Sequence, residues 1–201
     1  MEAARVACDT NGWTLVSDSS WPGYEKFPLA IMKGYAAMTD EIATECRATG
    51  TWPTHVFLQG GVGGLAGGLA NHIRIAWPEQ PVIIIVEPES AACLLESARA
   101  GASLRIDAKD SNMGRLDCAE PSMLAFEILS NTADAFVTVS NEEADSAVDR
   151  LKTLGLTTTP SGAAGYAGLI ALAGNKDMHN QFGLDGKARA LCFVTERALG
   201  E

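Results

Sequence analysis

The sequence predicts an α/β fold built around a doubly wound, mostly parallel β-sheet. Segments typical of strands and of helices alternate along the 201 residues, which is the pattern of strands joined by crossover helices. The run Val82–Val86 is apolar throughout and rich in β-branched residues, as expected of a strand buried on both faces of a parallel sheet. Because no repeat or linker interrupts the pattern, residues 1–201 are expected to form a single domain.

The amino-terminal part contains two expected strands and a long helix. Residues 13–16 read as a short strand that ends at Asp18. Apolar residues recur at helical spacing between residues 28 and 49, which predicts a helix. The apolar run 55–58 is the second expected strand, and a glycine-rich turn and a helix to about residue 76 follow it.

The middle of the chain contains the most apolar strand and a long loop. The strand at 82–86 ends at Glu87. The next helix, over 90–100, closes at Gly101, a residue suited to the left-handed conformation common at helix ends. Residues 102–121 are polar and irregular, and they are expected to form a loop over the strand ends.

The carboxyl-terminal part continues the alternation. A helix over 122–129 precedes a strand at 135–139. The segment 140–154 begins with a serine followed three residues later by a glutamate, the capping-box pattern that starts a helix. Residues 161–168 read as a second small-residue turn leading into a helix, and 190–194 as the last strand.

Composition excludes several classes of partner. The net charge is −10, and acidic and basic residues are interspersed, which argues against nucleic acid or an anionic membrane. The five cysteines and three histidines lack paired or metal-ligand spacing, so we expect reduced thiols and no metal site. No apolar signal segment follows Met1, and the longest apolar run is too short to span a bilayer. A cytoplasmic protein is expected.

The glycine-rich segment Gln59–Gly68 is the clearest candidate for ligand binding. A strand, a glycine turn and a helix in succession direct backbone N–H groups and a helix dipole at a phosphate. The segment lacks the Gly-Lys-Ser/Thr ending of a P-loop, so hydrolysis of nucleoside triphosphates is not expected. Tight helix–strand packing and a plain flexible turn remain alternatives. The predicted phosphate-binding residues are Gly60, Gly61, Val62, Gly63 and Gly64.

Other candidates lie where the expected strands end, because ligands of doubly wound sheets gather at the carboxyl ends of the strands. These positions also carry polar residues for purely structural reasons, as turn formers and caps. Glu87, which precedes a proline, is as plausible a turn former as a catalytic group. The polar residues at the strand ends are Asp18, Glu87, Ser140 and Thr195.

Blocks of sequence along nearly the whole chain carry a family resemblance. They are Asp18–Glu25, Ile31–Tyr35, Pro53–Gly64, Val86–Ser97, Cys118–Pro121, Ser161–Gly165 and Phe193–Glu196. In these blocks the chain resembles the carboxyl-terminal portion of the diaminopropionate ammonia-lyases, pyridoxal phosphate (PLP) enzymes of the tryptophan synthase β-like fold, fold type II. The motifs Asp-x-x-Trp-x-Gly-Tyr-Glu and Glu-Pro-x-x-Ala-Ala-Cys-Leu are specific to this lyase, whereas the glycine loop is shared across the fold type.

The resemblance implies an activity and roles for three parts of the site. The Gly60–Gly64 loop would hold the cofactor phosphate, and Thr195 would hydrogen-bond the pyridine nitrogen. Asp18 matches the aspartate that the family uses as an acid/base near the substrate. The family's reaction is an α,β-elimination that converts 2,3-diaminopropionate to pyruvate and ammonia, and its enzymes are homodimers.

The resemblance also implies an incomplete active site. The family's Schiff-base lysine lies in an amino-terminal domain, and none of the chain's lysines falls in a block that matches the lysine motif. They are Lys26, Lys33, Lys109, Lys152, Lys176 and Lys187. Covalent attachment of PLP is therefore not expected, and the chain is expected to be inactive without a complementing amino-terminal half.

The sequence departs from the family pattern at two further positions. Arg115 stands where relatives carry small residues near the cofactor, so it could block the site or recruit a carboxylate. Arg197 replaces the family's glycine after Glu196.

Two functions are alternatives to the lyase. They are a non-catalytic remnant that keeps a phosphate-binding cleft, and a nucleotide-binding α/β domain in which Glu79 or Glu87 would contact a ribose.

Overall fold

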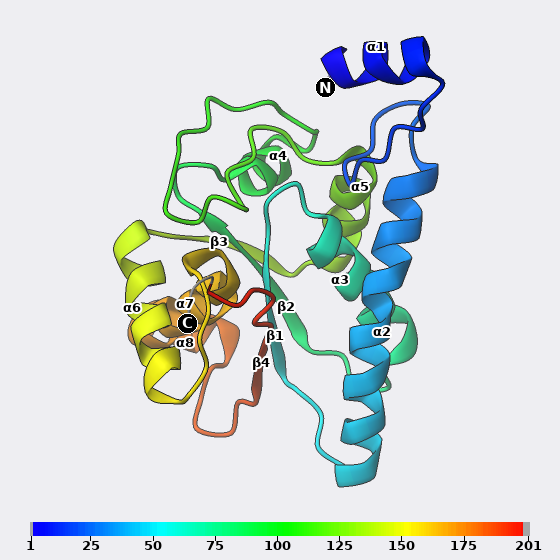
Figure 1. Ribbon diagram of the computed structural model, residues 1–201. Coiled ribbons are helices and arrows are strands. Elements are labelled where there is room, and N and C mark those ends of the chain that lie inside the picture. Colours follow the sequence, from blue (N-terminus) through cyan, green and yellow to red (C-terminus); the bar gives the residue numbers. More distant parts are fainter. Residues whose placement is uncertain (1, 199–201) are drawn as a thin grey trace.

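The computed structural model describes residues 2–198, and a four-stranded sheet forms its centre (Figure 1). The strands are β1 (His55–Gln59), β2 (Val82–Pro88), β3 (Ala135–Val139) and β4 (Ala190–Cys192). Their order is β3-β2-β1-β4, and each neighbouring pair is parallel. The predicted parallel sheet is therefore confirmed.

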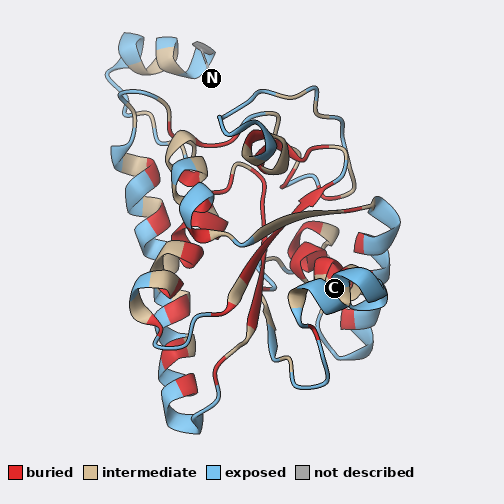
Figure 2. Cartoon of the chain, turned by 180° about the vertical axis from the view of Figure 1, so that it is seen from behind, coloured by how far each residue is buried: buried red, intermediate tan, exposed pale blue. Residues whose placement is uncertain are grey.

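Helices cover both faces of this sheet, as a doubly wound fold requires. They are α1 (Glu2–Asn11), α2 (Lys26–Thr49), α3 (Gly64–Ala76), α4 (Cys93–Ala100), α5 (Met123–Thr132), α6 (Asn141–Thr153), α7 (Pro160–Gly174) and α8 (Lys176–Phe182). Helices α2, α3 and α5 lie on one side of the sheet, and α6, α7 and α8 lie on the other (Figure 1). Figure 2 shows that buried residues follow the strands and the helix faces turned toward them.

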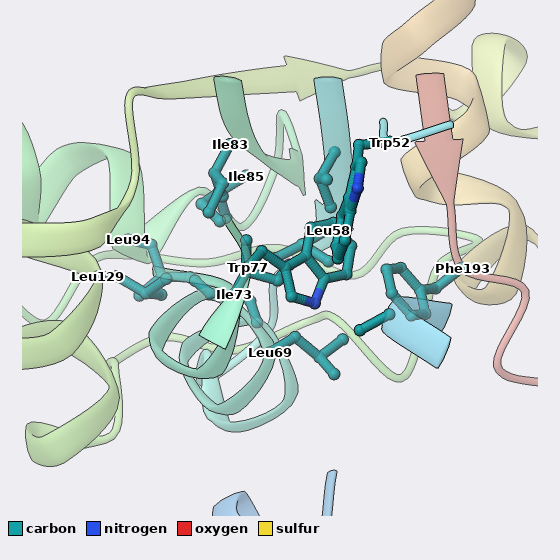
Figure 3. Packing of buried hydrophobic residues seen from close by; sticks show 14 of the residues in the cluster. Trp52, Leu58, Leu69, Ile73, Trp77, Ile83, Ile85, Leu94, Leu129 and Phe193 are labelled. Atoms are coloured by element: carbon teal, nitrogen blue, oxygen red, sulfur yellow. The ribbon is translucent and has the colours of Figure 1, made fainter. Parts of the chain in front are cut away.

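Alternation along the strands divides the core into two clusters. Ile83 and Ile85 of β2 pack with α2 and α3, whereas Ile84 packs with α6 and α7. Figure 3 shows the first cluster, in which the rings of Trp52 and Trp77 meet edge to face with centroids 5.4 Å apart. Because both faces of β2 are buried, an uninterrupted apolar run is what this strand needs.

Glycines at the start of α3 allow it to lie directly against α2. A Cβ atom added to Gly68 would lie 2.6 Å from the backbone oxygen of Met32, a contact that no side chain can have. A Cβ atom on Gly67 would come closest to the end of the flexible Met32 side chain, at 3.0 Å, and would otherwise make ordinary contacts with the Ala125 backbone. The second half of the glycine-rich segment therefore serves close packing, here between two helices.

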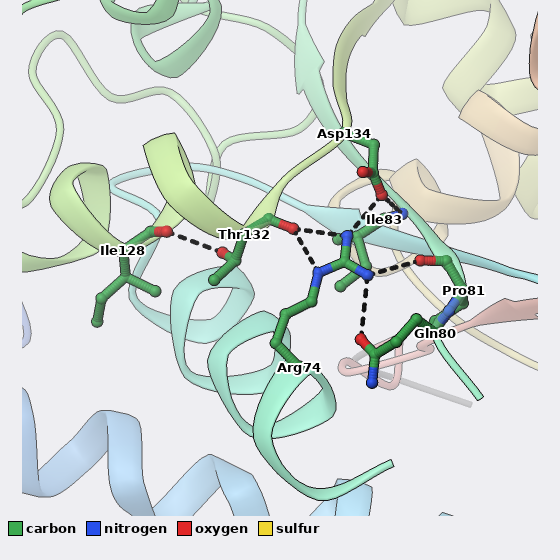
Figure 4. A network of polar contacts seen from close by, with 7 residues as sticks. All are labelled: Arg74, Gln80, Pro81, Ile83, Ile128, Thr132 and Asp134. Atoms are coloured by element: carbon green, nitrogen blue, oxygen red, sulfur yellow. Dashed lines mark hydrogen bonds and ion pairs between the residues drawn. The ribbon is translucent and has the colours of Figure 1, made fainter. Parts of the chain in front are cut away.

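A polar network around Arg74 fixes the amino end of the sheet (Figure 4). Its guanidinium donates to the carbonyl oxygen of Thr132 at the end of α5 and to that of Pro81 just before β2. It also pairs with Asp134 at 2.6 Å, and that carboxylate accepts the N–H of Ile83. The network joins the ends of α3 and α5 to the start of β2, at the edge opposite the candidate site.

The prediction of a strand at residues 13–16 is wrong. These residues form no strand and lie outside the sheet, and Trp13 and Val16 are 65% and 62% exposed. A strand needs a hydrogen-bonded neighbour, and this segment instead connects α1 to the rest of the chain. Helix α1, which precedes it, was not predicted.

The prediction of a turn at residues 161–168 is also wrong, because these residues form the first half of α7. Their small side chains let the helix lie on the sheet: a Cβ atom on Gly165 would be 3.0 Å from the Phe57 oxygen, and one on Gly168 would be 2.6 Å from Val86. Helix α8 was not predicted, and β4 ends two residues earlier than expected. The predicted loop at 102–121 contains no helix or strand, as expected.

Within residues 2–198, no helix has the length and apolar character needed to cross a bilayer.

Candidate functional site

A cavity of about 720 Å³ opens at the carboxyl ends of β1 and β4. Its size is within the range of small-molecule and cofactor sites. Its wall combines the glycine loop, the segment after β4, α2 and the loop before α5. Six of the seven site residues predicted from the sequence line it: Asp18, Gly61, Val62, Gly63, Gly64 and Thr195.

Gly60 is the predicted residue that does not line the cavity. Its N–H donates to the Val86 oxygen at 2.8 Å, so it continues the pairing of β1 with β2. A Cβ atom at this position would lie 2.8 Å from Leu94 and 3.0 Å from Ile85. Gly60 is therefore a glycine because the core is tight there, and its N–H is already engaged.

The rest of the glycine loop turns into α3 at the cavity wall. Gly63 is the N-cap of α3 and has φ +92°, a conformation that favours glycine. At Gly64 the atom nearest to an added Cβ would be the Asp18 oxygen, 3.9 Å away. The first N–H groups of a helix have no acceptor within it, and the dipole of α3 favours a negative charge at this end.

Asp18 is exposed at the cavity, on a segment held against the start of α5. The N–H of Ser20 donates to the Ser122 hydroxyl at 3.0 Å, and the Leu124 N–H donates to the Ser20 hydroxyl at 2.8 Å. The Asp18 carboxylate itself accepts a long hydrogen bond from Ser19, at 3.4 Å. The segment is thus fixed while the carboxylate remains accessible.

Thr195 is coupled to a buried amide that sequence reasoning missed. Gln59, the last residue of β1, donates from Nε2 to the Thr195 hydroxyl at 2.8 Å and to the Phe193 oxygen at 3.1 Å. Its Oε1 is buried without a hydrogen-bond partner. The available signal was a polar residue at the end of an otherwise buried strand, immediately before a glycine turn.

Arg115 pairs with a carboxylate at the cavity rim. Its Nε lies 3.2 Å from Oε1 of Glu196, and the Arg115 side chain is 78% exposed. Thr159, the N-cap of α7, donates to the other oxygen of Glu196. Of the two effects expected for Arg115, recruiting a carboxylate is the one observed.

Glu87 and Ser140 are helix caps. Glu87 is fully buried, and its two oxygens accept the N–H groups of Leu94 and Leu95 at the start of α4, at 2.7 and 2.8 Å. Burial raises the pKa of Glu87 to about 7, although these two hydrogen bonds act in the opposite direction. Ser140 forms the predicted capping box with Glu143. Neither residue lines the cavity.

Loop residues that the sequence left unassigned complete the wall. Leu116 and Cys118 face Gly61, and a Cβ atom there would lie 3.2 Å from each of them. Burial raises the pKa of the Cys118 thiol, although a hydrogen bond from the Val62 N–H acts in the opposite direction. The wall therefore carries a neutral thiol beside the glycine loop.

No lysine lines the cavity in the part of the chain that the structure describes, which includes all six lysines. All six are exposed on the surface. Within residues 2–198, no three His, Cys, Asp or Glu side chains form a group that could hold a metal ion. The arrangement can bind an anion and a small polar ring, but it presents no amine to an aldehyde.

Comparison with known proteins gives concordant results. A family model described as pyridoxal-phosphate dependent enzyme matches residues 1–196. The diaminopropionate ammonia-lyase of Escherichia coli (strain K12) is 39% identical over 136 residues, which are 67% of this chain and 34% of that protein. The Salmonella typhimurium (strain LT2) diaminopropionate ammonia-lyase is 33% identical over 220 residues, covering 97% of this chain and 52% of the relative.

A solved structure shows the same fold. The crystal structure of the Escherichia coli diaminopropionate ammonia-lyase in complex with an aminoacrylate-PLP azomethine intermediate has a TM-score of 0.88 and 32% identity. The match covers 98% of this chain and 52% of that one. The chain therefore spans about half the length of these relatives.

Proposed function

Because the chain belongs to the family of pyridoxal-phosphate dependent enzymes, we propose that it is the phosphate- and ring-binding part of a diaminopropionate ammonia-lyase. PLP is the cofactor of this family, and the fold is that of its fold type II members. The proposed reaction is the α,β-elimination of 2,3-diaminopropionate to pyruvate and ammonia. The observation that carries the proposal is one cavity lined by Asp18, the glycine loop and Thr195, in a chain similar to such a lyase over 97% of its length.

The cavity fits the cofactor in size, in backbone shape and in its polar atoms. The open position at Gly64 and the start of α3 suit a phosphate, so Gly61, Val62, Gly63 and Gly64 would hold that group. Thr195 would contact the ring nitrogen from the end of β4. The buried, unpartnered Gln59 oxygen lies in the same wall, and buried polar atoms without partners concentrate at functional sites.

The chain's own residues would supply positioning and one proton-transfer group. When bound, PLP withdraws electrons from the α-carbon of an amino acid and so makes its proton removable. Asp18 would exchange a proton with the substrate, since an amine leaves readily only after it is protonated. The Arg115–Glu196 pair would close the rim of the cavity against water.

Because no lysine of the described residues lines the cavity, the proposed activity requires a second polypeptide that supplies the Schiff-base lysine. We propose that residues 1–201 act as one α/β domain, equivalent to the carboxyl-terminal part of the lyase, and turn over only with a lysine-bearing amino-terminal half. A homodimer of such complemented units is part of the proposal. A cytoplasmic location is also proposed, and the five free cysteines of the described residues support it.

The experiment combines the chain with the amino-terminal half of a diaminopropionate ammonia-lyase. Pyruvate formed from 2,3-diaminopropionate and PLP is followed with lactate dehydrogenase. The chain alone is expected to form none, and the mixture is expected to form pyruvate continuously. An Asp18→Asn chain is the matched control, and its rate in the mixture should fall by about 10²–10⁴-fold. Absence of pyruvate from a mixture that forms a stable complex and binds PLP would refute the lyase.

A non-catalytic remnant is the second candidate, favoured by the fact that all six lysines lie outside the cavity. It would bind PLP or another phosphate ligand without turnover, even when the amino-terminal half is supplied. The nucleotide-binding alternative is weaker. Glu87 is fully buried and hydrogen-bonded to α4, so it is not available to a ribose.

A further inference from the structure

A second cavity of about 580 Å³ adjoins the candidate cofactor cavity, and Arg115, Ser161 and Glu196 belong to the walls of both. We propose that this second cavity is an anion-binding site that takes a small monocarboxylate, with Arg115, Arg197 and Ser161 as its donors. The site is separate from the phosphate loop, because no residue of the Gln59–Gly68 segment, all of which the structure describes, lines the second cavity. The proposal therefore does not depend on the proposed lyase activity.

The charges in the wall of the second cavity favour an anion. Arg115 and Arg197 both line it, whereas Glu196 is the one carboxylate among the described residues that does so. This leaves a local surplus of one positive charge in a chain whose net charge is −10. Positive charge gathered in a cavity raises the local concentration of anions. A single carboxylate balances this surplus, whereas a phosphate monoester carries a charge of about −1.5 to −2.

The two arginines have donors without partners. The Nε of Arg115 lies 3.2 Å from Oε1 of Glu196, and within residues 2–198 its two terminal nitrogens have no hydrogen-bond or ion-pair partner. Over the same residues, the Arg197 side chain has no such partner either. The terminal N–H groups of a guanidinium form a planar fork that matches a carboxylate. A carboxylate can therefore bind to Arg115 while the contact with Glu196 is kept.

Ser161 adds a buried hydroxyl to the wall that the two cavities share. Its side chain is 5% exposed, and its oxygen accepts the backbone N–H of Arg115 at 3.2 Å. Within residues 2–198 no group accepts the Ser161 proton, although buried polar groups are generally hydrogen-bonded. An oxygen of a bound carboxylate would accept this proton. Ser161 is the second residue of α7, where the helix dipole also favours a negative charge.

A titration of the ¹⁵N-labelled chain with pyruvate, followed by ¹H–¹⁵N chemical shifts at constant ionic strength, tests the proposal. Pyruvate is a small monocarboxylate, and pyruvamide is its neutral counterpart. We expect pyruvate to move the backbone signals of Arg115, Ser161 and Arg197 along one saturating curve, together with the Nε–H signal of Arg115. Pyruvamide should leave them unmoved. Unsaturated shifts of equal size at arginines over the whole surface would mean an adventitious ion only and would overturn the proposal.

The variants have expected effects of opposite sign. Arg115→Gln and Arg197→Gln should each weaken the binding of pyruvate by roughly fivefold, since each removes one exposed ion pair. Glu196→Gln should strengthen it by a similar factor, because it removes a competing negative charge and keeps an acceptor for Arg115. Arg105→Gln is the matched control and should leave the affinity unchanged. Arg105 is also exposed and also lies 3.2 Å from a carboxylate, that of Glu120, but it lines neither cavity.

The sign of the Glu196→Gln effect is decisive. If this variant binds pyruvate no better than the wild type, or if Arg105→Gln loses as much affinity as Arg197→Gln, the cavity does not select the anion and the proposal is wrong. Arg197 is exposed, so Arg197→Gln is expected to fold. The comparison of pyruvate with pyruvamide on the wild type decides the matter even if Arg115→Gln or Glu196→Gln does not fold.

Pyridoxine 5′-phosphate, which lacks the aldehyde of PLP, separates this proposal from the proposed function. It should bind in the cofactor cavity, and the saturated chain should still bind pyruvate. If pyridoxine 5′-phosphate does not bind while pyruvate does, the proposed function fails and the anion site stands. If pyridoxine 5′-phosphate binds and displaces pyruvate one for one, the two cavities form a single site and the proposal of a second site is refuted.

Discussion

Gly63 and Gly64 are neighbours in the glycine loop, but each is a glycine for a different reason. Gly63 has φ +92°, and a Cβ atom there would lie 3.1 Å from Leu94 and 3.2 Å from Ala125. Gly64 does not have a positive φ, and its nearest neighbour would be 3.9 Å away. The first glycine therefore allows the turn to form, and the second leaves room at the cavity wall.

This difference predicts opposite effects of two alanine substitutions. Gly63→Ala should lower the free energy of unfolding by about 1–3 kcal/mol, because it combines backbone strain with crowding. Gly64→Ala should raise it by about 0.4–1 kcal/mol, because alanine restricts the unfolded chain. Gly64→Ala should nevertheless weaken binding of pyridoxine 5′-phosphate. Urea denaturation and calorimetric titration of both variants test this, and equal stability of the two would contradict it.

The residues of the site were predictable only in part. A glycine turn after a strand predicts a phosphate loop, with close packing and a flexible turn as alternatives, and the block resemblance added Asp18 and Thr195. The only signal for Gln59 was that it is a polar residue at the end of a buried strand. Its partners could not be predicted, because they lie in the segment after β4, where Phe193, 134 residues away in the chain, provides the acceptor. Sequence spacing contains no information on such a contact.

Among the elements, α4 begins at a buried carboxylate that ties it to β2. Helix N-terminal N–H groups favour the charged form of Glu87, and burial favours the neutral form. Burial has the larger effect and raises the pKa of Glu87 from 4.5 to about 7. The folded state therefore binds this proton more tightly than the unfolded state does.

The stability of the α4 connection should consequently depend on pH. The contribution of Glu87 is fully present below about pH 4.5 and decreases as the pH rises to about 7, in total by about 3 kcal/mol. Glu87→Gln removes this titration and leaves the other groups unchanged. The stability of the wild type relative to this variant, measured by urea denaturation at several pH values, should thus fall across that window. A constant difference would show that the carboxyl group titrates normally.

Element prediction succeeded where local pattern and packing agree. The strands of the sheet interior and the capping box of α6 follow from apolar runs and from one serine–glutamate spacing. The segment 13–16 has strand-like residues, but it lies beyond the sheet and has no strand to pair with. The small residues of α7 look like a turn, because only the contacts of Gly165 and Gly168 with the sheet explain them.

At the scale of the whole molecule, the two ends of the parallel strands differ. The Arg74 network closes the sheet at the amino-terminal ends of its strands, whereas the cavity opens at the edge formed by their carboxyl-terminal ends. This edge brings together the start of α3, the end of β4 and the Asp18 segment, which come from distant parts of the chain. Under the proposed function it would supply a phosphate site and a ring contact. We therefore propose that the chain holds PLP by its phosphate and its ring, without a covalent bond to a lysine of its own.

This arrangement predicts how the chain treats the aldehyde of PLP. Since no lysine of the described residues lines the cavity, PLP and pyridoxine 5′-phosphate should bind with affinities that agree within roughly twofold, a difference of less than 0.5 kcal/mol. Borohydride reduction of the PLP complex should label only exposed lysines, in the same pattern as pyridoxal without phosphate, as peptide mass spectrometry would show. Much tighter binding of PLP, together with one lysine labelled selectively, would mean that a lysine of this chain reaches the cavity and that the anchor need not come from another polypeptide.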